Sequence, residues 1–245
     1  MSDWLFDLGN SRFKYAPLQG VRAGNVEAWP HGAEAMPDAA VQGLPSGGTA
    51  YVASVAAPAL TAAMLDVLRS RFTQVRVART EAEYAGLRIA YADPSKFGVD
   101  RYLALLAVVD RRQPVVVAGV GTALTVDLLD AHGQHHGGRI AASPTTMREA
   151  LHARAVQLPP SGGNYAEFAN DTADALASGC DGAAVALIER SCAQAAGVLG
   201  TVPALLVHGG GAPALMPLLP DAQFHAALVL DGLARWAVHQ PPAAR

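Results

Sequence analysis

Near its start the chain reads Trp4-Leu5-Phe6-Asp7-Leu8-Gly9-Asn10-Ser11-Arg12-Phe13-Lys14, which predicts a buried strand, a tight turn and a returning strand. Glycine in the turn tolerates a positive φ and lets the backbone pass close to a phosphate. Asn10 and Ser11 can donate hydrogen bonds to phosphate oxygens, and Lys14 can supply a point charge. Asp7, at the end of the first strand, can hold a hydrated magnesium ion. An ordinary hairpin with a Gly-Asn turn would have the same sequence, so the segment needs support from elsewhere.

A similar pattern recurs in the middle of the chain. Residues 115–118 predict a buried strand, residues 119–122 a glycine turn, and residues 123–129 a returning strand. Aligning the two patterns brings Gly9 over Gly121, and Thr122 could then offer its amide and hydroxyl to ATP phosphates. A buried hairpin whose threonines serve strand propensity is the alternative. The recurrence predicts two similar halves, residues 1–112 and residues 113–245.

The remaining pattern alternates strands and helices, which predicts an α/β fold. Further strands are expected at 49–55, 75–77 and 204–207, and helices at 58–72, from 98, from 144, at 172–196 and at 229–238. Ser143 is the expected N-cap of the helix that starts at Pro144. Residues 20–48 are expected to form irregular strand and loop, and His135-His136 is interpreted as a solvated polar turn.

Composition excludes several classes of protein. A chain of 245 residues with 51% hydrophobic and 16% charged residues can bury a substantial core. The net charge of −3 gives no basic field for nucleic acid or an anionic membrane, and no apolar run approaches the roughly 20 residues that span a bilayer. Cys180 and Cys192 match no zinc or redox spacing, so we expect free thiols in a cytoplasmic protein.

A third segment, Tyr91 to Arg101, places an acidic and a basic side chain, Asp100 and Arg101, directly after Gly98 and Val99. Gly98 gives access, Asp100 places a carboxylate near a helix start, and Arg101 can grip a substrate carboxylate with two parallel hydrogen bonds. Alternatively, Asp100 only stabilises the helix N-terminus and Arg101 is solvated.

These segments belong to a series of short motifs that together resemble the type III pantothenate kinase family over nearly the whole chain. The series is Asp-x-Gly-Asn at 7–10, Gly-x-Asp-Arg at 98–101, Gly-Thr-Ala-x-Thr-x-Asp at 121–127, Gly-Gly-x-Ile at 137–140, Met-Arg-Glu-Ala-Leu at 147–151, Asn-Asp-Thr at 170–172 and three glycines at 209–211. The resemblance implies a duplicated ribonuclease H-like (actin-like ATPase) fold with the active site between the halves. It also implies a homodimer that uses ATP with Mg²⁺ to phosphorylate pantothenate, the first step of coenzyme A synthesis.

The resemblance also implies roles for individual residues. Asp100 would be the general base, Asp7 would order the metal, and Gly209 to Gly211 would lie near the adenosine end of the nucleotide. The implied ATP-phosphate residues are Asp7, Leu8, Gly9, Asn10, Ser11, Arg12, Phe13, Lys14, Gly121 and Thr122. The implied pantothenate residues are Tyr91, Gly98, Val99, Asp100, Arg101 and Thr172.

Two positions depart from the family pattern. The family usually has an acid two residues before the glycine of its second phosphate motif, linked to an activating K⁺ or NH₄⁺, whereas this chain has Gly119. We therefore expect weak dependence on monovalent cations. Ala142-Ser143 replaces the expected Pro-Gly. A non-catalytic accessory regulatory factor and a kinase for another small hydroxylated carboxylate remain alternatives; Asp100 favours an enzyme, and Arg101 favours a substrate with a carboxylate.

Overall fold

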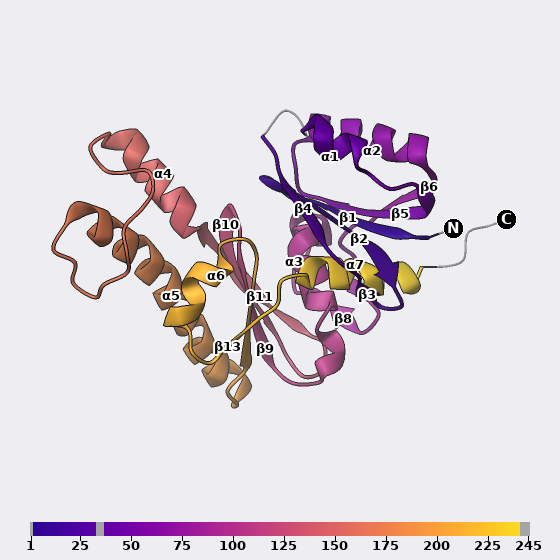
Figure 1. Cartoon of the computed structure of the whole chain (residues 1–245). Helices are drawn as coiled ribbons and strands as arrows, with labels where there is room; N and C mark the ends of the chain where they lie inside the picture. Colours follow the sequence, from indigo (N-terminus) through magenta and orange to yellow (C-terminus); the bar gives the residue numbers. More distant parts are fainter. Residues whose placement is uncertain (1, 33–36, 241–245) are drawn as a thin grey trace. The chain divides into compact units, whose positions relative to one another are not determined.

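The computed structural model describes residues 2–32 and 37–240, which form two compact units (Figure 1). The first unit contains the chain up to Arg111 and takes up the chain again from Ala227, while residues 112–226 form the second unit. The sequence-based division at 112/113 lies next to the first of these boundaries, but it would assign the last helix to the second half. That helix packs in the first unit instead, against the helix that begins at Val99.

The first unit is built on the sheet β3-β2-β1-β5-β6, with β4 also pairing with β2. Its strands are β1 Trp4–Leu8, β2 Arg12–Gln19, β3 Arg22–Ala23, β4 Glu27–Pro30, β5 Gly47–Ser54, β6 Phe72–Val77, β7 Glu83–Tyr84 and β8 Leu87–Arg88. Its helices are α1 Asp38–Gln42, α2 Pro58–Arg71, α3 Val99–Leu106 and α7 Leu228–Val238, with 3-10 turns at Pro94–Lys96 and Val109–Arg111.

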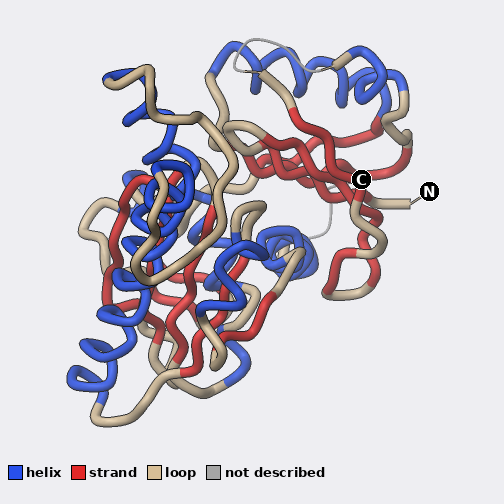
Figure 2. The backbone as a smooth tube through the Cα atoms, turned by 60° about the vertical axis from the view of Figure 1, so that its left-hand side comes forward, coloured by secondary structure: helices blue, strands red, loops and turns tan. Residues whose placement is uncertain are grey.

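The second unit is built on the sheet β11-β10-β9-β12-β13 (Figure 2, strands in red). Its strands are β9 Val115–Val120, β10 Ala123–Leu129, β11 His135–Ala142, β12 Ala204–His208 and β13 Ala222–Phe224. Its helices are α4 Pro144–Arg154, α5 Thr172–Leu199 and α6 Ala212–Leu215, followed by a 3-10 turn at Met216–Leu218.

The two sheets have the same topology, which confirms the predicted duplicated α/β fold. In the first unit β1 pairs antiparallel with β2 and parallel with β5, and β5 pairs parallel with β6. In the second unit β9 pairs antiparallel with β10 and parallel with β12, and β12 pairs parallel with β13. Each central strand therefore lies between its hairpin partner and a parallel strand that comes much later in the chain.

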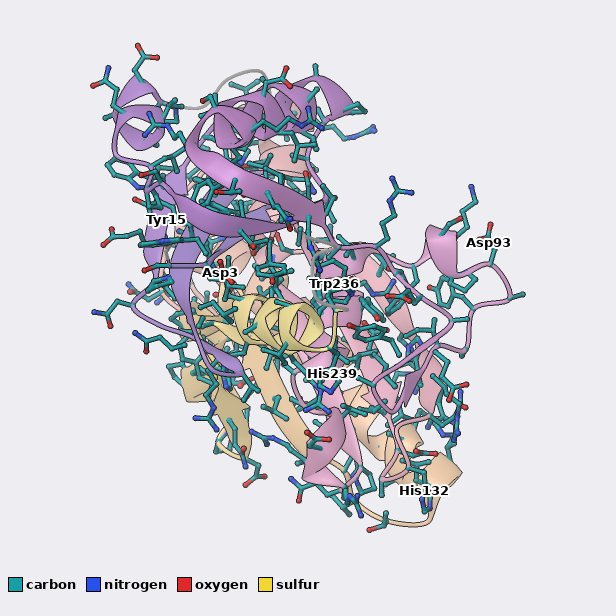
Figure 3. The ribbon with its side chains drawn as sticks, turned by 90° about the vertical axis from the view of Figure 1, so that its right-hand side faces the viewer. Asp3, Tyr15, Asp93, His132, Trp236 and His239 are labelled. Atoms are coloured by element: carbon teal, nitrogen blue, oxygen red, sulfur yellow. The ribbon has the colours of Figure 1, made fainter. Side chains whose placement is uncertain are left out.

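Both faces of the first sheet are covered, because α1 and α2 lie over one face and α3 and α7 over the other (Figure 1). The apolar face of α2, with Leu60, Met64 and Leu68, packs with Phe6 of β1 in one buried cluster. On the other face the Tyr51 ring meets the ring of Trp236, which Figure 3 labels on α7, edge to face at 6.3 Å. Two covered faces explain why β1 is apolar at every position except Asp7 rather than alternating.

The second sheet is organised around β9, whose six residues are all buried. Val116, Ala118 and Val120 of β9 pack in one cluster with Ala184 and Ile188 of α5.

Among the described residues, no helix combines the length and the apolar character needed to cross a membrane.

Four local expectations can be compared with the structure. Ser143 caps α4 as predicted, since its hydroxyl accepts a hydrogen bond from Thr146 N at 3.3 Å. Residues 20–48 contain the short strands β3 and β4, as predicted, but the helix α1 was not predicted; residues 33–36 are outside the described residues. The solvated turn at His135 was also wrong: His135 is fully buried on β11, and its Nε2 lies 3.0 Å from Asp127 Oδ1. Cys180 and Cys192 are free thiols, as expected.

Candidate active site

The first glycine turn joins β1 to β2 and places an acid opposite a base. Gly9 N donates to Arg12 O at 3.0 Å, which closes the turn, and the strand register pairs Asp7 with Lys14. Of the residues implied to bind phosphate, Asn10, Ser11 and Arg12 are exposed at this turn. Leu8 and Phe13 are buried in the core, at 1% and 0% exposure, so only their backbone could meet a ligand.

His31 is a supporting residue of this turn that the sequence did not reveal. Its Nε2 lies 3.0 Å from Gly9 O and its Nδ1 lies 2.7 Å from Gly32 O, while its backbone N donates to Ser11 O at 3.1 Å. Twenty-two residues separate His31 from Gly9, and only the pairing of β4 with β2 brings them together. No local sequence signal marks such a contact.

The first turn of α3 carries the proposed base. Asp100 Oδ1 accepts a hydrogen bond from Arg101 N at 2.9 Å, so the carboxylate curls back over the start of the helix. A Cβ on Gly98 would lie 2.7 Å from Asp100 Oδ1. Gly98 therefore leaves the space that this carboxylate occupies, which is the structural reason for glycine at the helix start.

Asp7, Lys14 and Asp100 form one electrostatic group although they come from β1, β2 and α3. Burial raises the pKa of Asp7 to about 7, the Lys14 ammonium opposes this shift, and the Asp100 carboxylate adds to it. The structure thus brings the acid of the first turn and the proposed base into electrostatic contact within one unit.

Arg101 lies next to Asp100 and is held by aromatic rings. Its guanidinium carbon is 4.4 Å from the Phe97 ring centroid and 6.0 Å from the Tyr91 centroid. Arg101 Nη1 also lies 3.4 Å from Tyr91 Oη, to which it donates. With an exposure of 6%, Arg101 is not the solvated residue of the alternative interpretation. Such cation–π contacts keep a planar guanidinium in one orientation, as recognition of a carboxylate requires.

The loop before α3 is itself stiffened. Asp93, labelled in Figure 3 on the loop that projects beside the sheet, accepts hydrogen bonds from Ser95 N at 3.0 Å and Ser95 Oγ at 2.6 Å. Thr80 Oγ1 donates to Phe97 O at 2.7 Å. These bonds fix the backbone between Tyr91 and Phe97, the two aromatic residues that hold Arg101, and at Phe97 itself.

The second glycine turn joins β9 to β10 and has a matching hydrogen bond, from Gly121 N to Ala123 O at 2.9 Å. Thr122 is exposed, and its carbonyl accepts a hydrogen bond from Thr146 Oγ1 at 2.6 Å. Because Ser143 caps the same turn of α4 on Thr146, the helix start holds this glycine turn in place. The capping pattern was visible in the sequence, but the contact of Thr146 with Thr122 was not.

The glycine cluster after β12 lies against the same turn. Gly211 N donates to Val120 O at 2.9 Å, and Gly209 has φ +96°. A Cβ on Gly209 would lie 2.8 Å from Val120 C, and one on Gly211 would lie 2.8 Å from Val120 Cγ1. Gly209 thus lets its backbone pass close to the backbone of Val120, and Gly211 leaves room for the Val120 side chain. Both lie at the carboxyl ends of two parallel strands, where α/β sheets bind their ligands.

Thr172 is the remaining residue predicted to bind substrate. It is exposed and opens α5, directly after the N-cap Asp171, whose Oδ1 accepts from Ala173 N at 2.9 Å and Asp174 N at 3.0 Å. The hydroxyl therefore lies at a rigid helix start.

A hollow of about 220 Å³ lies elsewhere in the second unit and contains none of the predicted site residues. Its lining includes Asp127 and Arg139, and Arg139 Nη1 donates to Ser191 Oγ at 2.5 Å. Within the described ranges, no cluster of three or more His, Cys, Asp or Glu could hold a metal ion.

Comparison with known proteins agrees with the family resemblance of the motif series. Residues 4–194 match the family profile described as type III pantothenate kinase. A protein named type III pantothenate kinase from Stenotrophomonas maltophilia is 76% identical over 241 residues, which cover 98% of this chain and 99% of the relative. A protein of the same name from Xanthomonas campestris pv. campestris is 74% identical over 239 residues, 98% of each chain.

Two solved structures share the fold at low sequence identity. A conserved putative Baf family transcriptional activator from Campylobacter jejuni has a TM-score of 0.64 at 17% identity, and the match covers 97% of this chain and 100% of that one. A putative 2-dehydro-3-deoxygalactonokinase from Sinorhizobium meliloti has a TM-score of 0.59 at 15% identity, covering 99% and 98%.

Proposed function

The chain belongs to the type III pantothenate kinase family, and we propose that it transfers the γ-phosphate of ATP to the hydroxyl of pantothenate, giving 4'-phosphopantothenate for coenzyme A synthesis. The observation that carries this proposal is the group formed by Asp7, Lys14 and Asp100 on three elements of one unit. The oriented Arg101 on the residue next to Asp100 supports it.

Asp100 acts as the general base in this mechanism. Phosphoryl transfer depends on positioning and on charge neutralisation more than on covalent chemistry, so a carboxylate beside the attacking hydroxyl is the main requirement. Asp100 takes the hydroxyl proton as the oxygen attacks the γ-phosphate. Its place in the first turn of a helix, with Gly98 leaving it room, holds the carboxylate in one position.

Arg101 recognises the carboxylate of pantothenate. A guanidinium offers two parallel N–H donors that match a carboxylate, and this pairing fixes both the distance and the orientation of the substrate. Stacking on Phe97 keeps the plane of the guanidinium constant, so less side-chain entropy is lost on binding. Tyr91, Gly98, Val99 and Thr172 complete the proposed pantothenate contacts.

Mg²⁺ fits the residues around Asp7. Mg²⁺ is commonly held by one or two carboxylates together with substrate phosphates and water, so a single acid at a strand end is an adequate protein ligand. Burial, and to a lesser extent the Asp100 carboxylate, raise the pKa of Asp7, and a divalent cation beside Asp7 would favour its ionised form. When bound with ATP, Mg²⁺ neutralises charge on the phosphates; Lys14 does the same from the neighbouring strand.

The two glycine turns bind the ATP phosphates through backbone amides and hydroxyls. Asn10, Ser11 and Arg12 are the proposed donors in the first unit, and Thr122 is the proposed donor in the second. Gly9 and Gly121, whose own amides close the turns, let the backbone approach the phosphates closely. Gly209 to Gly211 line the adenosine end. A homodimer and a cytoplasmic location complete the proposal. The motif resemblance implies the homodimer, and the free thiols of Cys180 and Cys192 support the cytoplasmic location.

A coupled assay of ADP release with pantothenate tests this function. We expect saturable turnover that falls by about 100-fold or more in Asp100→Asn. Asparagine keeps the shape of the side chain, so the melting temperature and the ATP affinity should change little. An equal rate in Asp100→Asn would refute the assignment of the base.

The same assay separates the rival functions. Turnover with other hydroxylated carboxylates, but none with pantothenate, would identify a kinase for a different substrate. Absence of turnover with any such acceptor, while ATP still binds, would favour an accessory regulatory factor.

A further inference from the structure

At position 119 this family usually has an acid that is linked to a monovalent cation, whereas this chain has Gly119. The space that such an acid would occupy is filled by the side chain of His208. At Gly119 a Cβ would lie 2.8 Å from Thr125 Oγ1, 2.9 Å from His208 Nε2 and 3.2 Å from His208 Cε1. Ordinary contacts of a Cβ begin near 3.4 Å. An edge of the His208 imidazole thus occupies the space into which a side chain at 119 would extend.

The sheet register explains this contact. β9 lies between β10 and β12, and Gly119 is the direct partner of Thr125 on one side and of His208 on the other. Direct partners on neighbouring strands place their side chains on the same face, about 5 Å apart. With Thr125 on one side and His208 on the other, a side chain at position 119 fits only if these two side chains shift.

The first unit shows the opposite arrangement at the equivalent position. Asp7 stands two residues before Gly9, as Gly119 stands two residues before Gly121. The direct partners of Asp7 are Lys14 on the hairpin strand and Ala53 on the parallel strand. Where the central strand carries an acid, the parallel strand carries a small residue; where the central strand carries glycine, the parallel strand carries a histidine.

The donors around Gly119 do not fit a K⁺ or NH₄⁺ site. Hard cations such as K⁺ take oxygen ligands, whereas the side-chain atoms nearest to this position are one hydroxyl and an imidazole edge. Asp127 lies on the same face of β10 as Thr125, but it is 3% exposed and its Oδ1 lies 3.0 Å from His135 Nε2. That carboxylate is committed to a buried pair inside the sheet.

We infer that His208 replaces the cation-linked acid of the family, and that this kinase turns over without a monovalent cation. Gly119 and His208 form a coupled pair, in which glycine is required because the imidazole fills its place. The inference rests on the proposed pantothenate kinase activity. It goes beyond that activity by assigning a role to His208 and by predicting that the second glycine turn binds no monovalent cation.

The first test compares the wild-type enzyme in KCl, NH₄Cl and choline chloride at one ionic strength. Turnover is expected to agree within about twofold, because equal ionic strength removes general screening effects. A rise of about tenfold in K⁺ or NH₄⁺ over choline would overturn the inference. A complete lack of turnover in all three salts would instead contradict the proposed function, so the two failures are distinguishable.

The second test rebuilds the arrangement of the first unit in the second. Gly119→Asp alone forces a side chain against His208 and is expected to lower the melting temperature. Adding His208→Ala, which copies Ala53, opens the space, so Gly119→Asp/His208→Ala should recover most of that loss. The double variant should also gain a K⁺-specific rise in melting temperature, because a carboxylate is now available to a cation.

His208→Ala alone is the matched control. It opens the same space without adding a carboxylate, so its melting temperature should not respond to K⁺ over choline. The coupled-pair inference is refuted if Gly119→Asp is as stable as wild type, if the double variant recovers none of the lost stability, or if the K⁺ response is as large in wild type as in the double variant. The melting readout needs no turnover, so it holds whatever the substrate proves to be.

Discussion

Helices α3 and α7 approach each other so closely at Gly232 that this residue admits only glycine. A Cβ there would overlap Leu103 O and would lie 2.5 Å from Leu103 C and 3.0 Å from Leu103 Cα. These atoms belong to the backbone of α3 and cannot rotate away, unlike a side-chain terminus. Gly232→Ala must therefore push the two helices apart by about 1 Å to reach an ordinary contact distance.

The size of the effect follows from two opposing contributions. Alanine in a helix interior is favoured over glycine by about 1 kcal/mol. Overpacking of a rigid contact costs about 1–3 kcal/mol or more, and separation also loosens Leu233 and Ala234, which are both fully buried. We expect a net loss of about 2 kcal/mol, which lowers the melting temperature of a unit of this size by roughly 8 °C.

Thermal unfolding of the purified full chain measures this loss, and Gly197→Ala provides a matched control. Gly197 lies inside α5, and no heavy atom lies within 4 Å of the position that a Cβ would take there, so the same substitution should stabilise the protein by up to about 1 kcal/mol. Because α3 carries Asp100, Gly232→Ala should also lower kcat at a temperature where it is folded. Equal melting temperatures for Gly232→Ala and wild type would refute the tight crossing.

Three further predictions concern the site. The pKa of Asp7 lies near 7 in the folded state, against about 4 for an aspartate in the unfolded chain, so folded wild type loses stability as pH rises from about 4 to 7. Asp7→Asn should therefore be more stable than wild type at about pH 8, by about 2 kcal/mol once the partial exposure of this side chain is discounted, and should unfold at a higher urea concentration. It should show no gain in stability near pH 4, and it should lose kinase activity. Equal urea midpoints at about pH 8 would contradict the raised pKa. Arg101→Lys removes the planar group stacked on Phe97, so KM for pantothenate should rise about tenfold while kcat changes less; an unchanged KM would contradict carboxylate recognition. Ser143→Ala removes the cap on Thr146 N and should cost about 1 kcal/mol and raise KM for ATP; a variant with wild-type stability would show that the cap contributes nothing.

The sequence alone determined the local elements. The turns at Gly9 and Gly121, the cap at Ser143 and the helix that begins near Gly98 were all predicted close to where they lie. Each depends on residues within a few positions of one another, where backbone propensity and capping act. The recurrence of strand, glycine turn and strand also predicted the duplication, because each half repeats the same short-range pattern.

Only the tertiary structure decided which distant residues meet. The return of α7 to the first unit, the contact of His31 with Gly9, the buried pair of His135 and the fit of His208 against Gly119 had no local signal. Each arises from strand or helix pairing between segments that are far apart in the chain, or from burial imposed by the sheet. These contacts are set when strands and helices pack together. The local sequence pattern indicates which residues favour a strand or a helix, but it does not indicate which residues become neighbours across a sheet.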